Sequence, residues 1–158
     1  LRDQDVPVEL ELIGTFETPE YEQRILSLID ELQLQSSVTC SGFTSDIPSA
    51  MHRLDCLLLP SLFGEGMPMV VLEAIANAVP VIASKVEGTP EVIRDGVEGF
   101  LAEPGCSASL ANCIRKLVSS REQWQELSDR AHLRHQEKFS DVAMAQAVAR
   151  AYRKVLDA

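Results

Sequence analysis

No run of about 18 apolar residues occurs in this 158-residue chain, so the sequence predicts no transmembrane helix. A basic excess is also missing, because 14 Lys and Arg stand against 24 Asp and Glu, and the formal net charge is -10. This balance argues against bulk binding of nucleic acid and weakly against an electrostatic hold on anionic lipid. The first five residues, LRDQD, form neither a signal peptide nor a start methionine, which favours a piece of a larger protein.

None of the four cysteines, at positions 40, 56, 106 and 113, forms a CxxC pair. Cys40 and Cys56 lie within or beside apolar runs of strand type, and Cys113 lies on the apolar face of an expected helix. Buried, reduced thiols are therefore a better interpretation than a metal site or a disulfide framework. Reduced thiols are typical of cytoplasmic proteins, so the sequence predicts a cytoplasmic location.

What the chain does contain is an alternation of strands and helices, followed by three helices. Strands are expected at 8–13, 38–41, 56–59, 80–83 and 99–102. Helices are expected at 20–34, 69–77, 121–138 and 141–156, the last capped by Ser140. Three further helices are expected, capped by Asp46, Thr89 and Ser107. The pattern predicts an α/β fold over 1–158, with one doubly wound, Rossmann-like parallel sheet and extra C-terminal helices. Ligands in such sheets bind at the carboxyl ends of the strands.

The segment from Ser61 to Ala74 lies at such a strand end and places Glu65 and Glu73 on either side of a short Gly/Pro turn. The turn leads into an apolar helix, whose first backbone N–H groups form a ready site for phosphate. A carboxylate before the turn can reach one end of a ligand held there, and a carboxylate along the helix can reach the other end. This arrangement suits a nucleotide-sugar, with its diphosphate in the middle.

Several blocks in order resemble the C-terminal, donor-binding domain of a retaining GT-B glycosyltransferase of the GT4 type. Residues 65–74, EGMPMVVLEA, are similar to the family's E-x7-E motif. The other matching blocks are IG at 13–14, SGF at 41–43, LDCLLLPS at 54–61, PVIAS at 80–84, GTPEVI at 88–93 and DGVEGFL at 95–101. The resemblance covers about residues 8 to 156 and implies that an N-terminal acceptor domain is absent from the chain.

The resemblance implies roles for individual residues. Glu65 is the catalytic carboxylate that contacts hydroxyls of the donor sugar, and Glu73 holds the ribose hydroxyls. The diphosphate is bound by backbone amides, and Pro68 has no N–H to offer. The donor-binding residues implied are Gly42, Phe43 and Thr44 at the nucleobase and Gly66, Met67, Met69 and Val70 at the diphosphate.

The resemblance also implies the ligands and partners. The donor is an NDP-sugar, with UDP or GDP favoured, and neither a cofactor nor a divalent metal is expected. The family's phosphate-binding Arg and Lys lie upstream of the strand at 8–13, and Lys85 is the nearest replacement. The absent N-terminal domain is a partner and the route for any peripheral membrane contact. Apolar surface near Tyr152 predicts weak self-association.

Other interpretations stay open at the level of sequence. The chain could be a nucleotide-sugar binding module without catalysis, or a hydrolase that pairs Glu65 with Glu73. Glu73 alone could be a favourable charge near a helix start. His132 and His135 are expected to be surface residues, while Trp124 is expected to pack in a core or against another domain.

Overall fold

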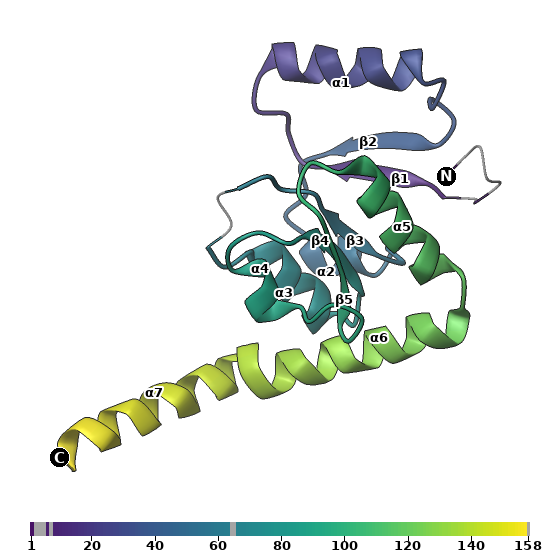
Figure 1. Cartoon of the computed structure of the whole chain (residues 1–158). Helices are drawn as coiled ribbons and strands as arrows, with labels where there is room; N and C mark the ends of the chain where they lie inside the picture. Colours follow the sequence, from purple (N-terminus) through teal and green to yellow (C-terminus); the bar gives the residue numbers. More distant parts are fainter. Residues whose placement is uncertain (2–5, 7, 64–65, 158) are drawn as a thin grey trace. The chain divides into compact units, whose positions relative to one another are not determined.

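The computed structural model describes residues 1, 6, 8–63 and 66–157 (Figure 1). The chain divides into two compact units, Leu1–Ile47 and Pro48–Ala158. All strands in the described ranges run parallel, in two sheets with the orders β1-β2 and β3-β4-β5. The predicted α/β class with parallel strands is confirmed, although the strands form two sheets where one was expected.

The first unit consists of β1 (Leu10–Ile13), α1 (Pro19–Glu31) and β2 (Val38–Gly42). Helix α1 begins after Thr18, whose hydroxyl accepts a hydrogen bond from the Tyr21 N–H at 3.2 Å. It ends three residues before the expected end, and Gln33 then takes a positive φ of 55°. No described residue of this unit is buried, so the unit has no closed core of its own.

The second unit is built on a three-stranded sheet of β3 (Leu57–Leu59), β4 (Val81–Ser84) and β5 (Gly99–Ala102). Helices α2 (Ile47–Met51), α3 (Met69–Ala76) and α4 (Thr89–Val92) precede or connect these strands. The middle strand β4 is buried along its whole length, as is typical of a parallel strand covered on both faces. A Cβ on Gly99 would collide with the carbonyl oxygen of Val81, so glycine is required where β5 meets β4.

Helices α5 (Ser107–Val118) and α6 (Arg121–Arg134) close the core of this unit. One cluster of buried side chains joins β4, β5, α5 and α6, and Trp124 packs against it as expected for a core residue. Its members are Ile82, Phe100, Ala102, Cys113, Leu117 and Leu127.

Side-chain hydrogen bonds fasten α6 to the loops beside it. The hydroxyl of Ser128 donates to the carbonyl oxygen of Ala78 at 2.6 Å, and Nδ1 of His132 donates to that of Ala76 at 2.9 Å. The guanidinium of Arg134 donates to the carbonyl oxygens of Glu91 and Val92, both at 2.6 Å. The expectation of a surface role for His132 was therefore wrong, because its ring is half-buried and satisfies a carbonyl at the end of α3.

The C-terminal helices differ from the expected pattern in detail. A π-helical turn, η2 (His135–Phe139), interrupts the expected helix before α7 (Asp141–Leu156) begins at its predicted cap, Ser140. The predicted caps Thr89 and Ser107 were each one residue too late, since Gly88 and Cys106 occupy the cap positions. Helix α7 has no buried residue and leads away from the sheet of the second unit (Figure 1). Among the residues that the structure describes, no helix is long and apolar enough to cross a membrane.

Candidate functional site

The predicted turn between Ser61 and Pro68 follows the carboxyl end of β3 and leads into α3. Leu62, Phe63 and Met67 are exposed in this turn, while Pro68 is buried and occupies the cap position of α3. Glu65, the predicted catalytic carboxylate, lies outside the described residues together with Gly64. The turn is thus anchored at Pro68, and its residues 62, 63, 66 and 67 are exposed to solvent.

The start of α3 offers backbone N–H groups without a partner in the described part of the chain. Pro68 supplies no side-chain cap, and its carbonyl oxygen accepts from the N–H of Val71 at 3.0 Å. The N–H groups of Met69 and Val70 donate to no described residue. Helix α3 has eight residues, so its dipole adds partial positive charge at this end. The arrangement favours an anion at the start of α3.

Glu73 lies one helical turn after Met69 and is half-buried. Its carboxylate forms no hydrogen bond or ion pair with any residue that the structure describes. The side-chain amide of Asn77 donates instead to the backbone carbonyl of Glu73, at 2.8 Å. Because residues i and i+4 share a helix face, Met69 and Glu73 lie on one side of α3. A half-buried carboxylate that has no partner among the described residues is suited to accept hydrogen bonds from ligand hydroxyls.

A cavity of about 230 Å³ lies at the carboxyl edge of the three-stranded sheet. It is lined by Pro60, Ser84, Ala102, Glu103, Gly105, Cys106, Ser107 and Leu110. A Cβ added to Gly105 would lie 3.6 Å from the Leu62 side chain, so the turn after β3 approaches the loop after β5. The sequence analysis considered the turns after the first three strands only. The rule that ligands bind at strand carboxyl ends also covers the turns after β4 and β5, and could have found these residues.

The predicted nucleobase residues Gly42, Phe43 and Thr44 belong to the first unit, at the carboxyl end of β2. Gly42 has a positive φ of 69°, which favours glycine there. The ring of Phe43 is 76% exposed, and the hydroxyl of Thr44 accepts from the Asp46 N–H at 3.2 Å. An exposed aromatic ring on a fixed turn can stack on a planar base.

The cysteines fall into two classes. Burial raises the pKa of the Cys56 thiol to about 12, and burial also raises the pKa of the Cys113 thiol above its ordinary value. These two thiols are therefore protonated and poorly reactive. The expectation of burial was wrong for Cys40 and Cys106, which are exposed on β2 and at the start of α5. Within the described ranges, no group of three or more His, Cys, Asp and Glu side chains could hold a metal ion.

Comparison with known proteins places the chain in a family. Residues 1–134 match the family described as glycosyl transferases group 1. The chain belongs to this family. The resemblance to GT-B glycosyltransferases that the motifs indicated is thereby confirmed, and so is the prediction of an enzyme family.

Two curated relatives illustrate the range of the family. The chain is 30% identical over 152 residues to N-acetyl-alpha-D-glucosaminyl L-malate synthase of Bacillus anthracis, covering 96% of this chain and 39% of the relative. It is 28% identical over 130 residues to alpha-D-kanosaminyltransferase of Streptomyces kanamyceticus, covering 81% of this chain and 33% of the relative. The chain therefore spans well under half the length of these relatives.

A solved structure shows the same fold. The crystal structure of Anabaena Alr3699/HepE in complex with UDP has a TM-score of 0.88 and 30% sequence identity, and the match covers 96% of this chain and 42% of that chain. The same Anabaena protein has also been crystallised with UDP-glucose, with a TM-score of 0.86. The parallel α/β architecture of this family is thus the architecture of the present chain.

Proposed function

We propose that this chain is the donor-binding part of a retaining, GT4-type glycosyltransferase. The whole protein would transfer a sugar from a UDP- or GDP-sugar to an acceptor glycan, lipid or small molecule. The observation that carries this proposal is the start of α3. Its first amides, and the carboxylate of Glu73 one helical turn later, have no partner among the residues that the structure describes. The UDP and UDP-glucose complexes of the similar Anabaena protein support a nucleotide-sugar donor.

Different predicted residues bind the different parts of the donor. The diphosphate accepts hydrogen bonds from the amides of Gly66, Met67, Met69 and Val70. Glu73 accepts from the two ribose hydroxyls, and Glu65 of the E-x7-E motif contacts the hydroxyls of the sugar as the catalytic carboxylate. The base stacks at the turn formed by Gly42, Phe43 and Thr44.

These groups act in the transfer reaction by electrostatic stabilisation. Cleavage of the bond between the sugar and the diphosphate leaves additional negative charge on the phosphate oxygens. Backbone N–H groups fixed at the start of α3 stabilise that charge without reorganising, which lowers the barrier to departure. We propose that no divalent metal and no cofactor besides the donor takes part.

The wider assignments follow from the same proposal. Residues 1–158 form a single donor-binding domain, and the acceptor site lies in an N-terminal domain of the full-length protein. Any peripheral contact with a membrane is made through that N-terminal domain, and the protein works in the cytoplasm. The length of the relatives, of which this chain covers 39% and 33%, supports a second domain.

The test is calorimetric titration of the full-length protein with UDP, GDP and ADP and with their sugar conjugates. Glu73→Ala should raise the Kd of the preferred diphosphate about 10- to 100-fold, because it removes hydrogen bonds to a charged group. Glu65→Ala should raise the Kd of the sugar conjugate and leave that of the diphosphate unchanged. Gly66→Ala should weaken binding of the diphosphate. It should not lower the stability of the protein, since a Cβ there meets no atom within 4 Å.

Glu122→Ala, in the first turn of α6, is the matched control for removing a carboxylate and should leave every Kd unchanged. Equal affinity of wild type and Glu73→Ala for every nucleotide would refute the assignment of Glu73. Binding without transfer to any acceptor by the full-length protein would favour a binding module instead. The 158-residue chain alone should transfer no sugar, and the anomeric configuration of the product, read by NMR, tests retention.

A further inference from the structure

The cavity at the carboxyl edge of the three-stranded sheet contains a buried polar group. Ser84 lines this cavity and is only 3% exposed, and its hydroxyl forms no hydrogen bond with any residue that the structure describes. Side chains two residues apart on a strand share a face, so Ser84 lies on the same face of β4 as Ile82. Ile82 packs in one cluster with Cys113 and Leu117 of α5. The hydroxyl of Ser84 is therefore directed to the α5 side of the sheet, into the cavity. A buried hydroxyl that has no partner is costly, which points to a ligand that binds there.

The start of α5 brings a thiol and free N–H groups to the same cavity. Cys106 lines the cavity, is exposed, and occupies the cap position of α5 without a side-chain hydrogen bond to the helix. The N–H groups of Ser107 and Ala108, in the first turn, donate to no residue in the described ranges. Helix α5 has 12 residues, so its dipole adds partial positive charge at this end. This end of the cavity is therefore suited to a carboxylate.

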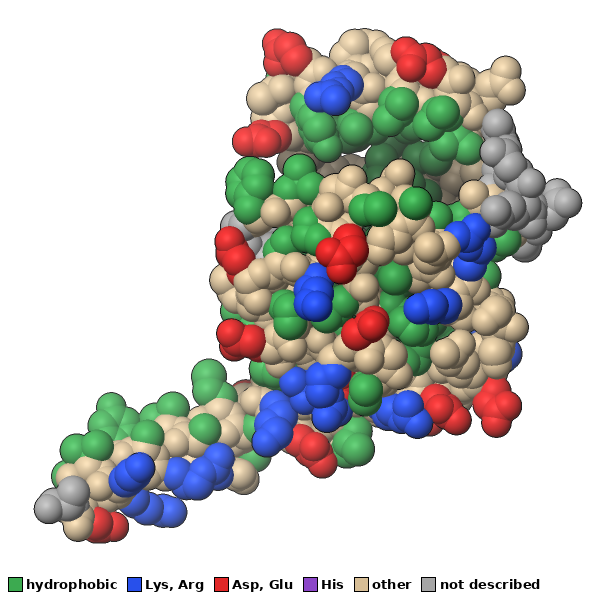
Figure 2. All heavy atoms as spheres, viewed as in Figure 1, with side chains coloured by type: hydrophobic (Ala, Val, Ile, Leu, Met, Phe, Trp, Pro, Cys, Tyr) green, Lys and Arg blue, Asp and Glu red, His purple; other side chains and the backbone are tan. Residues whose placement is uncertain are grey.

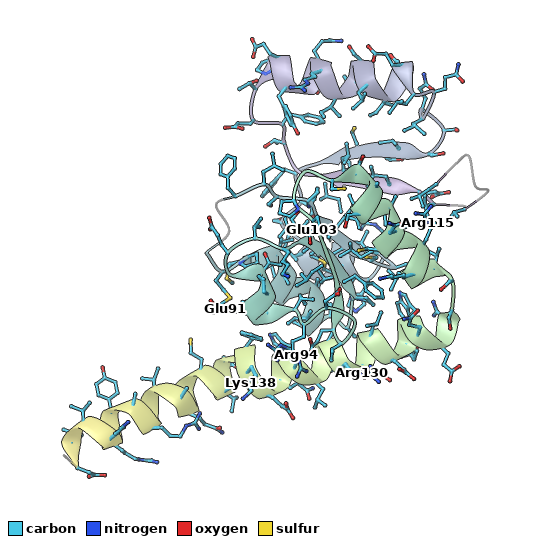
Figure 3. All side chains as sticks on the ribbon, viewed as in Figure 1. Glu91, Arg94, Glu103, Arg115, Arg130 and Lys138 are labelled. Carbon is cyan, nitrogen blue, oxygen red and sulfur yellow. The ribbon has the colours of Figure 1, made fainter. Side chains whose placement is uncertain are left out.

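Glu103 gives the cavity a negative charge. It lines the cavity, is exposed, and is labelled in Figure 3. Its carboxylate forms no hydrogen bond or ion pair with the residues that the structure describes. The Glu103 N–H donates to the hydroxyl of Ser109 at 3.0 Å, which fixes the loop before α5. The cavity thus offers an acceptor for an ammonium group, and N–H and hydroxyl donors for a carboxylate, beside one thiol. An amino acid carries both of these charged groups.

The size of the cavity fits a ligand of this kind. Its volume of about 230 Å³ is several times the roughly 30 Å³ that one water occupies in the liquid. The apolar part of the lining, Pro60, Ala102 and Leu110, can contact the carbon atoms of the ligand. The cavity can therefore hold the amino acid part of a small molecule that is attached to Cys106.

We propose that Cys106 is a site of reversible modification by a low-molecular-weight disulfide that carries an amino acid group, such as cystine. The thiolate of Cys106 attacks one sulfur of the disulfide. A bond forms between Sγ of Cys106 and that sulfur, and the disulfide bond of the reagent breaks. The other half leaves as a thiolate, which takes up the proton that Cys106 has lost. The reagent is the oxidant, so no further electron acceptor takes part.

The attached group is held by the cavity. Its carboxylate accepts hydrogen bonds from the hydroxyl of Ser84 and from the first N–H groups of α5, and its ammonium group pairs with Glu103. The proposal goes beyond the proposed function, because none of these residues is among those that we assign to the donor. The two sites are close, since a Cβ on Gly105 would lie 3.6 Å from the side chain of Leu62 in the turn after β3.

The test compares two disulfides on the full-length protein without nucleotide. Cystine carries the ammonium and carboxylate groups, whereas hydroxyethyl disulfide carries neither. Peptide mass spectrometry follows the rate at which each reagent modifies Cys106. The readout is the ratio of the two rates, because a change in the reactivity of the thiol itself cancels in this ratio. The ratio of the cystine rate to the hydroxyethyl disulfide rate should be about 10-fold higher in the protein than in an unstructured peptide of residues 103–109.

Variants of the cavity separate recognition from simple exposure of the thiol. Ser84→Ala should lower the ratio about 5- to 10-fold, because it removes a hydrogen bond to a charged group. It should leave the urea denaturation midpoint unchanged, since the hydroxyl has no partner among the described residues. Glu103→Gln should lower the ratio about 2- to 5-fold, as expected for an exposed ion pair. Ser119→Ala, at the other end of α5, is the matched control and should not change it.

Two outcomes would overturn the proposal. One is an equal ratio in the protein and in the peptide, which would mean that Cys106 reacts only as an exposed thiol. The other is a Cys106 that reacts with neither disulfide, which would mean that the rest of the full-length protein covers it. None of these measurements depends on nucleotide, so they can fail independently of the proposed function.

Discussion

At the scale of single residues, two ion pairs of the second unit, Arg94–Glu98 and Glu126–Arg130, share the i,i+4 spacing and differ in burial. Glu98 is fully buried and accepts from the backbone N–H of Arg94 at 2.9 Å and from its Nε at 2.9 Å. Arg134 approaches the same carboxylate at 3.9 Å. Glu126 and Arg130 form the other pair, with 53% and 49% of their side chains exposed. Arg94 and Arg130, the exposed arginines of the two pairs, are labelled in Figure 3.

We therefore predict that Glu98→Gln lowers the free energy of unfolding by about 1.5–3 kcal/mol, because buried hydrogen bonds to a charged group are lost. The same change at Glu126 should cost no more than about 0.5 kcal/mol, because water replaces an exposed partner. Urea denaturation of both variants at neutral pH measures the difference. Similar losses in the two variants would show that the burial of Glu98 adds nothing to its pair.

At the scale of elements, α3 ends with a non-glycine residue in the left-handed region. Ala78 has a φ of 58°, where glycine is usual at a helix end, and its carbonyl oxygen accepts from Ser128. We predict that Ala78→Gly raises the free energy of unfolding by up to about 1 kcal/mol through relief of this strain. Ala76→Gly, within the helix, should lower it by about 0.5–1 kcal/mol. Thermal unfolding of the two variants should show shifts of opposite sign.

The order and type of the elements could be predicted because each strand and helix carries its own local pattern. The apolar runs at 56–59 and 80–83 indicated β3 and β4, and Ser140 marked the start of α7. The division into two sheets could not be predicted, because it depends on which strands are neighbours and not on any one of them. The predicted caps Thr89 and Ser107 were wrong because Gly88 and Cys106 can also adopt the backbone conformation that begins a helix.

The candidate site, too, could be predicted from the sequence only in part. The start of α3 and Glu73 were predicted as donor-binding from a turn, a proline and a helix pattern within one short segment, and the structure has α3 begin at Met69 after Pro68. The cavity at Ser84, Glu103 and Ser107 was missed because its residues come from strand ends far apart in the sequence. Only the pairing of β3, β4 and β5 brings those ends to one edge.

At the scale of the whole molecule, net charge and exposed apolar surface have opposite effects on the self-association of the chain. Figure 2 shows hydrophobic side chains along one side of α7 and Lys and Arg side chains along another. The exposed apolar residues of this helix are Val142, Met144, Val148, Tyr152, Val155 and Leu156. The formal net charge of -10 makes copies of the chain repel one another. Salt screens this repulsion and leaves apolar contact largely intact.

We therefore predict that the 158-residue chain self-associates weakly through α7 and that added salt strengthens the association. Sedimentation velocity over a range of protein concentrations should show a sedimentation coefficient that rises with concentration, more steeply at high salt. Tyr152→Lys on the apolar face should abolish the rise, while Gln146→Lys, which adds the same charge on the polar face, should not. Association that weakens with salt would mean that ion pairs hold the copies together. In the full-length protein the rise should disappear, because the N-terminal domain that we propose as the partner of this chain would cover the same face of α7.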